Sequence, residues 1–281
     1  MTDRIPLAAV LGSPVAHSRS PALFAHWLRQ VGARGHYVPI DVAPDRLSET
    51  LRVLPGLGFR GANVTIPHKT AALELADAVS DRAALIGAAN TLTFLEDGRI
   101  HADNTDGAGF LAALRAGAPG WRAQAGSAAV LGAGGAARAV IAALIEAGVP
   151  EIRLTNRSRG RAEMLRAEFG ARLKVMDWNR AGSVFDGAAL AVNTTSLGMA
   201  GGQPMRVPLD GLGAGMTVMD LVYVPLETPF LAAARAVGAT AVDGLGMLLH
   251  QAVPGFERWF GQRPVVDEAA RRAALGFAAA H

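Results

Sequence analysis

The chain has 281 residues, of which 51% are hydrophobic and 18% charged, and 33 glycines, a composition typical of a folded α/β protein with one large or two modest domains. It has no cysteine, which excludes disulfides, thiolate metal ligands and a cysteine nucleophile. The net charge is +3, but the arginines are scattered, which argues against nucleic-acid binding and favours a small anionic substrate or a phosphorylated cofactor.

The N-terminal part alternates between strand and helix patterns, as the spacing of apolar residues indicates. The predicted elements are strand 7–12, helix 21–31, strand 36–42, helix 45–54, strand 62–66 and helix 69–79. A hairpin with an Asp-Gly turn then joins 91–95 to 99–102, and a helix begins near Asp106. This part is therefore predicted to form an α/β domain with a mainly parallel sheet.

Two hydroxyl residues, Ser18 and Ser20, stand just before the first of these helices. Because proline favours the first helical position, Pro21 predicts that Ser20 is the N-cap. A capping role alone is one interpretation. Free amides and paired hydroxyls at a helix start also suit a carboxylate, so the segment is a candidate anion site.

Lys69 is one of only two lysines in a chain with 25 arginines. An arginine keeps its proton permanently, whereas a lysine can release one, so a retained lysine indicates a possible chemical role. Asn63 and Thr65 are two residues apart and would share one face of the predicted strand 62–66. Pro67 would end that strand and place Lys69 in the turn beyond it; a solvated surface lysine is the alternative.

A glycine-, alanine- and proline-rich stretch, 117–126, precedes a second strand-helix alternation. Its strands are predicted at 128–131 and 151–155 and near Leu173, Ala189 and Thr217, with helices at 136–147 and 161–169. Repeated β-α-β units of this kind predict a Rossmann-type, doubly wound parallel sheet. We therefore predict one domain over 1–106, completed by C-terminal helices in 245–281, and a Rossmann dinucleotide-binding domain over 107–244.

A glycine fingerprint follows the predicted strand 128–131 directly. The segment from Gly132 to Arg138 reads G-x-G-x-x-A and opens a helix. The first glycine makes a tight turn, the second lets backbone amides approach a pyrophosphate, and the small last residue lets helix and strand pack closely. A glycine turn with only a structural role is the alternative.

The residues after the next strand select the cofactor. A carboxylate there would bind the ribose 2′-hydroxyl of NAD, but this strand ends in Asn156-Arg157-Ser158, followed by Arg159 and Arg161. Guanidinium groups bind phosphate oxygens in pairs. The sequence therefore predicts NADP(H) as the cofactor.

Several segments together resemble one family. They are His17 to Pro21, Asn63 to Lys69, Gly87-Ala88-Ala89-Asn90-Thr91, Asp103 to Gly107, Gly132 to Arg138, Asn156-Arg157-Ser158 and Asp243 to Met247. Their order and spacing are similar to those of the shikimate dehydrogenases over nearly the whole chain. The resemblance implies reversible, NADPH-dependent reduction of 3-dehydroshikimate to shikimate, in the pathway towards aromatic amino acids. It also assigns substrate binding and catalysis to the domain over 1–106.

The resemblance implies a role for each matching residue. Ser18 and Ser20 would bind the substrate carboxylate. The residues expected at the ring hydroxyls and the reacting oxygen are Thr65, Lys69, Asn90, Asp106 and Gln251, with Tyr223 also near the substrate. The cofactor residues are Gly132, Gly134, Gly135, Ala136, Asn156, Arg157, Ser158, Arg161 and Gly244. No metal is implied.

The chemistry agrees with a catalytic role for Lys69 and Asp106. Hydride delivered to a ketone carbon leaves negative charge on the oxygen, which needs a proton and a cation nearby. A lysine ammonium supplies both, and the Asp106 carboxylate can hold it in place; a capping role for Asp106 at its helix is the alternative.

Three positions depart from the family pattern. Phe24 stands where histidine is frequent, Ser158 replaces a commoner threonine, and His68 occupies a position that is often aromatic. Ser158 keeps the hydroxyl, and Phe24 is expected to be a packing substitution.

Other functions remain open at this point. They are a quinate/shikimate dehydrogenase of broader substrate or NAD use, a non-catalytic NADP-binding regulator, and a pterin-linked dehydrogenase of similar shape. The first residues lack an apolar core and no apolar stretch is long enough to cross a bilayer, so a cytoplasmic location is expected, with no membrane partner. The protein is expected to be a monomer or homodimer.

Overall fold

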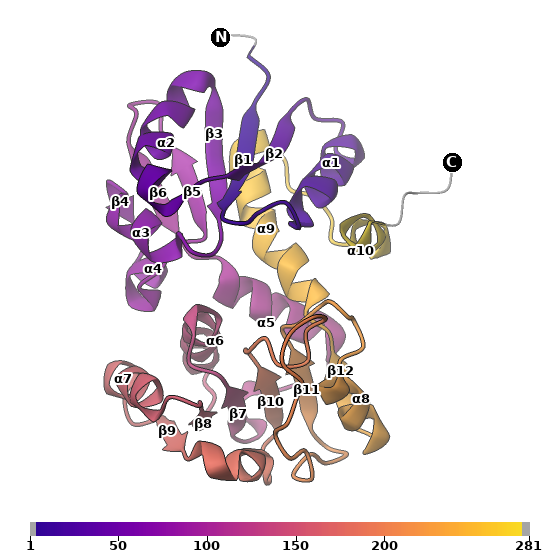
Figure 1. Cartoon of the computed structure of the whole chain (residues 1–281). Helices are drawn as coiled ribbons and strands as arrows, with labels where there is room; N and C mark the ends of the chain where they lie inside the picture. Colours follow the sequence, from indigo (N-terminus) through magenta and orange to yellow (C-terminus); the bar gives the residue numbers. More distant parts are fainter. Residues whose placement is uncertain (1–3, 277–281) are drawn as a thin grey trace. The chain divides into compact units, whose positions relative to one another are not determined.

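The computed structural model describes residues 4–276, which fold into two compact units (Figure 1). Among these residues, unit 1 contains 4–105 and 249–276, and unit 2 contains 106–248. The chain leaves unit 1 after Thr105 and returns to it at Leu249, within helix α9 (Leu245–Phe260). Both units contain a sheet with helices, which confirms the predicted α/β fold class.

Unit 1 is built on a six-stranded sheet with the order β2-β1-β3-β5-β6-β4. The strands are β1 (Leu7–Gly12), β2 (His36–Asp41), β3 (Phe59–Val64), β4 (Ala78–Val79), β5 (Thr91–Phe94) and β6 (Ile100–Asp103). β1 runs parallel to β2 and β3, and β4 runs parallel to β6. Only β5 is antiparallel to its neighbours, so the sheet is mainly parallel, as predicted.

The helices of unit 1 pack on this sheet. They are α1 (Ser20–Gln30), α2 (Leu47–Val53), α3 (Lys69–Glu74), α4 (Asp81–Ile86), the C-terminal part of α9 and α10 (Glu268–Leu275). Phe24 of α1 belongs to an aromatic cluster: its ring centroid lies 3.7 Å from that of Tyr37, 5.5 Å from that of Phe256 and 5.7 Å from that of Trp27. Trp259 and Phe260 complete this cluster. Phe24 is fully buried, which agrees with the expected packing role.

Unit 2 has a six-stranded, entirely parallel sheet with the order β12-β11-β10-β7-β8-β9. The strands are β7 (Ala128–Leu131), β8 (Ile152–Thr155), β9 (Leu173–Met176), β10 (Leu190–Asn193), β11 (Thr217–Asp220) and β12 (Thr240–Val242). The helices are α5 (Asp106–Gly117), α6 (Gly135–Glu146), α7 (Arg159–Phe169) and α8 (Pro229–Ala236), and α9 begins here. Taken from β7 outwards, this is the doubly wound order 3-2-1-4-5-6 of dinucleotide-binding domains.

Alternating residues of β7 fill two separate cores in unit 2. Val130 packs with α6 side chains such as Val140, whereas Leu131 packs on the other face with Phe185 and Phe230. A strand buried on both faces reads as a continuous apolar run, which is why residues 128–131 contain no polar side chain.

Two sequence predictions near the substrate motifs are wrong. Strand β3 ends at Val64 instead of residue 66, because the chain turns at Thr65, whose carbonyl accepts the His68 N–H at 2.9 Å. Asn63 and Thr65 therefore do not share a strand face. Ser20 is not the N-cap either: Arg19 occupies that position, and Ser20 is the first residue of α1.

The helix predicted over 69–79 is also too long. It ends at Glu74, and residues 78–79 form the two-residue strand β4. Asp77 causes the break, since its backbone N–H donates to the Ile100 carbonyl at 2.9 Å and its carboxylate accepts the Ile100 N–H at 2.8 Å. These bonds pair the segment with β6 and outweigh its helix propensity.

Within residues 4–276, none of the helices combines the length and the apolarity that crossing a bilayer would need.

Candidate substrate and cofactor sites

The segment that carries Ser18 and Ser20 connects β1 to α1 and is held by the end of β2. The Asp41 carboxylate accepts the Ser13 hydroxyl at 2.8 Å and the Val15 N–H at 3.3 Å. Ser18 Oγ accepts the Ser20 N–H at 3.3 Å, so the hydroxyl that binds a backbone N–H at the start of α1 is that of Ser18 and not that of Ser20. Ser20 is buried and Ser18 half-buried, so both predicted carboxylate ligands lie on one short, fixed segment.

The turn after β3 holds Thr65 beside β1 and places Lys69 at the start of α3. The Thr65 N–H donates to the Leu11 carbonyl at 2.9 Å. His68 is buried, and its Nε2 lies 2.7 Å from the Val42 carbonyl; because a carbonyl only accepts, Nε2 carries the proton. His68 thus anchors the turn from inside. Lys69 is half-buried.

Asn90 and Gln251 come together in a network of buried polar side chains. Asn90 Nδ2 donates to Gln251 Oε1 at 3.2 Å, although 161 residues separate them. Thr105 binds both, since its N–H donates to Asn90 Oδ1 at 2.8 Å and its hydroxyl to the Gln251 carbonyl at 2.8 Å. The structure therefore places two predicted substrate residues side by side, with their amide groups fixed.

A buried carboxylate, Asp103, holds the strand end next to this network. It is fully buried and accepts two bonds from Arg82, at 2.6 and 2.5 Å, and one from Arg258 at 2.6 Å. Ser80 Oγ and the Asn104 N–H complete the set at 2.7 and 2.8 Å. Burial by itself would raise the pKa of Asp103, but the bonds from Arg82, Ser80 and Arg258 outweigh it and hold the pKa well below its usual value.

In unit 2, the glycine fingerprint forms the turn between β7 and α6. Gly132 has a φ of +104°, and a Cβ there would come within 2.7 Å of Thr195 Cγ2 and 2.8 Å of Thr194 Oγ1. Any other residue would be strained and would collide. By contrast, a Cβ at Gly134 or Gly135 would meet no atom within 4 Å, so open space lies over the start of α6.

This space lies where a dinucleotide is bound in such folds. Strands β7 and β10 are neighbours, and the strand order changes direction between them. The N-terminus of α6, with Gly134 at its N-cap and Ala136 in its first turn, can face a pyrophosphate. The predicted residues therefore fit a dinucleotide cofactor.

The turn after β8 presents cations without a carboxylate. Asn156 Nδ2 donates to the Ser158 carbonyl at 2.8 Å, which shapes the turn. Arg159 forms ion pairs with Glu163 and Asp177. Arg157 and Arg161 are exposed and have no ion pair within the described part of the chain, so their charge is available to a phosphate.

A second buried carboxylate, Asp220, fixes the loop that carries Tyr223. It accepts Asn193 Nδ2 at 2.9 Å, the Val222 N–H at 3.0 Å and Thr228 Oγ1 at 2.7 Å. Burial raises the pKa of Asp220 to about 6, and these hydrogen bonds oppose that effect only in part. Tyr223 itself is half-buried.

Gly244, the last predicted cofactor residue, packs directly on this loop. A Cβ at this position would lie 2.3 Å from the Leu221 carbonyl oxygen, so only glycine fits. Its strict size requirement therefore has a structural cause, and contact with the cofactor stays a prediction.

The predicted residues thus divide between the two units. Unit 1 contains Ser18, Ser20, Thr65, Lys69, Asn90 and Gln251; unit 2 contains Asp106, Tyr223 and all the predicted cofactor residues. The proton-transfer pair of Lys69 and Asp106 stays a prediction. The sequence indicated no role for Tyr37, Thr91, Thr105 or Asp220. Of these, only Thr91 and Thr105 could have been found, because each follows an asparagine in the polar pairs Asn90-Thr91 and Asn104-Thr105.

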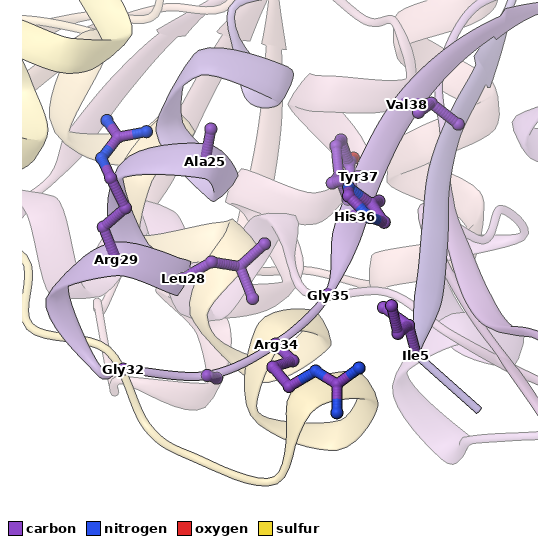
Figure 2. Close-up of a pocket in the computed structure, with 11 residues that line it drawn as sticks. Ile5, Ala25, Leu28, Arg29, Gly32, Arg34, Gly35, His36, Tyr37 and Val38 are labelled. Atoms are coloured by element: carbon purple, nitrogen blue, oxygen red, sulfur yellow. The ribbon is translucent and has the colours of Figure 1, made fainter. Parts of the chain in front are cut away.

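A groove of about 550 Å³ lies elsewhere in unit 1, beside β2 and the end of α1 (Figure 2). Leu28, Val38 and Ile5 give it apolar walls, and Arg29 and Arg34 stand at its rim. None of the predicted substrate or cofactor residues lines it. This groove is therefore not the candidate substrate site.

Comparison with known families gives three matches along the chain. Residues 10–92 match the shikimate dehydrogenase substrate binding domain, residues 119–197 match the shikimate / quinate 5-dehydrogenase family, and residues 244–275 match the shikimate 5'-dehydrogenase C-terminal domain. The three ranges contain most of the motifs described above.

Individual relatives match nearly end to end. The chain is 64% identical over 272 residues to the NADP⁺-dependent shikimate dehydrogenase of Cereibacter sphaeroides, covering 97% of this chain and 98% of the relative. The shikimate 5-dehydrogenase of Thermus thermophilus, solved with NADP(H) and shikimate, is 41% identical with a TM-score of 0.87, covering 98% of this chain and 100% of that one. The Corynebacterium glutamicum quinate dehydrogenase, solved with NAD, has a TM-score of 0.89 at 32% identity, covering 97% and 99%.

Proposed function

Because the chain belongs to the shikimate dehydrogenase family, we propose that it catalyses the reversible, NADPH-dependent reduction of 3-dehydroshikimate to shikimate, a step towards chorismate and the aromatic amino acids. The observation that carries this proposal is the 64% identity over 97% of the chain to an NADP⁺-dependent enzyme. The uncompensated Arg157 and Arg161 after β8 support NADP(H) over NAD(H).

In this proposal unit 1 binds the substrate. Ser18 and Ser20, fixed on one segment, donate hydrogen bonds to the carboxylate, and Thr65, Asn90 and Gln251 bind ring hydroxyls. A site with fixed polar groups rejects analogues that lack a hydroxyl, since a buried donor or acceptor is then left unpaired.

Unit 2 binds the cofactor, which supplies or accepts the hydride when bound. Gly132, Gly134, Gly135 and Ala136 form the pyrophosphate cradle at the start of α6. The 2′-phosphate is bound by the turn after β8, through Asn156, Arg157, Ser158 and Arg161. Tyr223 and Gly244 lie on two segments that pack on one another.

Lys69 performs the proton transfer. Its ammonium donates a proton to the substrate oxygen as negative charge develops there, and its amine takes the proton back in the reverse direction. Asp106 orients the lysine. Lys69 exchanges only a proton with the substrate oxygen, and the hydride would come from or return to the nicotinamide, so no covalent adduct forms with Lys69.

The test is a set of four assays that combine shikimate or quinate with NADP⁺ or NAD⁺, followed by the absorbance of the reduced nicotinamide. We expect the highest kcat/KM with shikimate and NADP⁺. A preference for quinate or for NAD⁺ would instead favour the quinate dehydrogenase function, and no turnover in any assay would favour a non-catalytic regulator.

We also propose that the enzyme is cytoplasmic and that it is a monomer or homodimer. Cell fractionation and sedimentation at several protein concentrations test these two points.

A further inference from the structure

A line of buried hydrogen bonds in unit 1 links strand β2 to helix α9. Tyr37 donates its hydroxyl proton to Asn63 Oδ1 at 2.8 Å, and Asn63 Nδ2 reaches Thr91 Oγ1 at 3.3 Å. Thr91 Oγ1 lies 3.0 Å from Asn90 Oδ1, and Asn90 Nδ2 lies 3.2 Å from Gln251 Oε1. The line therefore ends at two residues of the proposed substrate site, whereas Tyr37 and Asn63 are not among the predicted substrate residues.

The donors in this line have one consistent direction. The Asn90 carbonyl lies 3.2 Å from Asn63 and can only accept, so Asn63 turns Nδ2 towards it and Oδ1 towards Tyr37. Thr91 accepts from Asn63, which leaves its own proton for Asn90 Oδ1. Asn90 Oδ1 also accepts a backbone N–H at 2.8 Å, so the Nδ2 group is the one that faces Gln251.

Tyr37 is well placed to hold the first amide of this line. Its ring is stacked on Phe24 at 3.7 Å between centroids, and only 8% of the residue is exposed. Figure 2 shows it on β2 beside His36, where the strand borders the groove. Burial raises the pKa of Tyr37 well above its usual value, so the hydroxyl keeps the proton that Asn63 needs; a weaker, opposing effect comes from a hydrogen bond with Ser20.

We propose that Tyr37 is a positioning residue for substrate recognition: through Asn63 it holds the start of strand β5, and so keeps the amides of Asn90 and Gln251 in place for the ring hydroxyls. This inference rests on the proposed function. Without the Tyr37 proton, Asn63 Oδ1 loses its donor, so Asn63 binds the Asn90 carbonyl and Thr91 Oγ1 less firmly. An amide that is held less firmly forms a weaker hydrogen bond to its ring hydroxyl, so the site discriminates less against an analogue that lacks this hydroxyl.

The experiment compares the wild type with Tyr37→Phe, which removes the hydroxyl and keeps the ring. Two readouts are the KM for shikimate and the KM for NADP⁺. The third is a selectivity ratio: kcat/KM for shikimate divided by kcat/KM for an analogue that lacks one ring hydroxyl, where the missing hydroxyl is not the one that is oxidised. We expect the shikimate KM to rise roughly tenfold and the ratio to fall several-fold, in line with the loss of one buried hydrogen bond. The NADP⁺ KM should stay within about twofold.

Trp27→Phe is the matched control. Trp27 belongs to the same aromatic cluster, and its indole N–H donates to the Val265 carbonyl at 3.1 Å, outside the line of amides. This variant should lose thermal stability but keep the wild-type ratio. Equal changes in both variants, or a wild-type KM and ratio in Tyr37→Phe, would overturn the inference, whereas a wild type inactive on shikimate would contradict the proposed function instead.

Asn63→Ala tests the same line of hydrogen bonds at its second member. It should lower the ratio as Tyr37→Phe does, and the double variant should show no further fall, because both changes interrupt one line. Additive effects in the double variant would also overturn the inference.

Discussion

At the residue scale, the two lysines of the chain have contrasting environments. Lys174 is exposed on β9 and forms an ion pair with Glu151 at 2.5 Å. Lys69 is half-buried at the first position of α3, behind a turn anchored by the buried His68. Lys69 is thus the less exposed of the two and begins a helix after an anchored turn, which suits proton transfer at a fixed substrate atom.

Replacing Lys69 tests its catalytic role. Lys69→Met should lower kcat by about 10²–10⁴, because a general acid–base step contributes that much, while the affinities for shikimate and NADPH change only a few-fold. Steady-state kinetics and equilibrium binding give both quantities. Lys174→Met removes the other lysine and should keep turnover near the wild-type value. A Lys69→Met enzyme with near-normal kcat would contradict the assignment.

Arg157 and Arg159 are neighbours with different tasks. Arg159 already pairs with two carboxylates, whereas the exposed Arg157 does not. Arg157→Ala should therefore weaken NADPH binding about tenfold or more and leave NADH binding nearly unchanged, since only NADPH carries the 2′-phosphate. Titration calorimetry with each cofactor measures this, with Arg159→Ala as the control expected to show the smaller loss. Equal losses for NADPH and NADH in Arg157→Ala would exclude a contact with the 2′-phosphate.

At the scale of elements, each unit uses one buried carboxylate to join separate segments, with opposite effects on its ionisation. Asp103 joins β6 to α4 and α9 through two guanidinium groups, which favour its charge. Asp220 joins β11 to β10 and α8 through neutral donors only. Without a cation beside it, burial disfavours its charge.

The raised pKa of Asp220 makes the stability of the protein depend on pH in a defined direction. Its folded-state pKa of about 6 lies above the ordinary value of 3.8, so the folded state prefers the protonated form. This stabilising contribution is complete below about pH 4 and is lost as the pH rises through 6, with a total of roughly 2–3 kcal/mol.

Asp220→Asn removes this titration with little change of shape. The new amide can donate to Thr228 while its oxygen accepts from Asn193 and Val222, as protonated Asp220 does. The free energy of unfolding of the variant, relative to the wild type, should therefore increase between pH 4 and pH 7 in urea titrations. Asp210→Asn, at an exposed position of the same unit, should show a flat difference. A flat difference for Asp220→Asn as well would contradict the prediction.

At the scale of the whole molecule, the sequence predicted what local patterns determine. The apolar run of β7 and the glycines after it lie within a dozen residues, so they indicate both a Rossmann-type sheet and its ligand-binding turn. Features that depend on distant partners were not predicted. Helix α3 stops because Asp77 pairs with Ile100, and the bond between Tyr37 and Asn63 spans 26 residues, so no window along the chain reveals either.

The order of the chain through the two units leads to a last prediction. Unit 2 is one continuous segment, 106–248, with its own two cores and the complete cofactor turn, whereas unit 1 needs residues from both ends of the chain. Phe256 and Trp259 of α9 belong to its aromatic cluster, and Arg258 neutralises the buried Asp103. A fragment of residues 106–248 should therefore fold and bind NADP⁺ more tightly than NAD⁺. Fragment 1–105 should not fold, because it leaves Asp103 with one guanidinium and the Phe24 ring exposed. Circular dichroism tests whether each fragment folds, and calorimetry measures the binding of NADP⁺ and NAD⁺. A folded fragment 1–105, or a fragment 106–248 that binds no NADP⁺, would contradict the prediction.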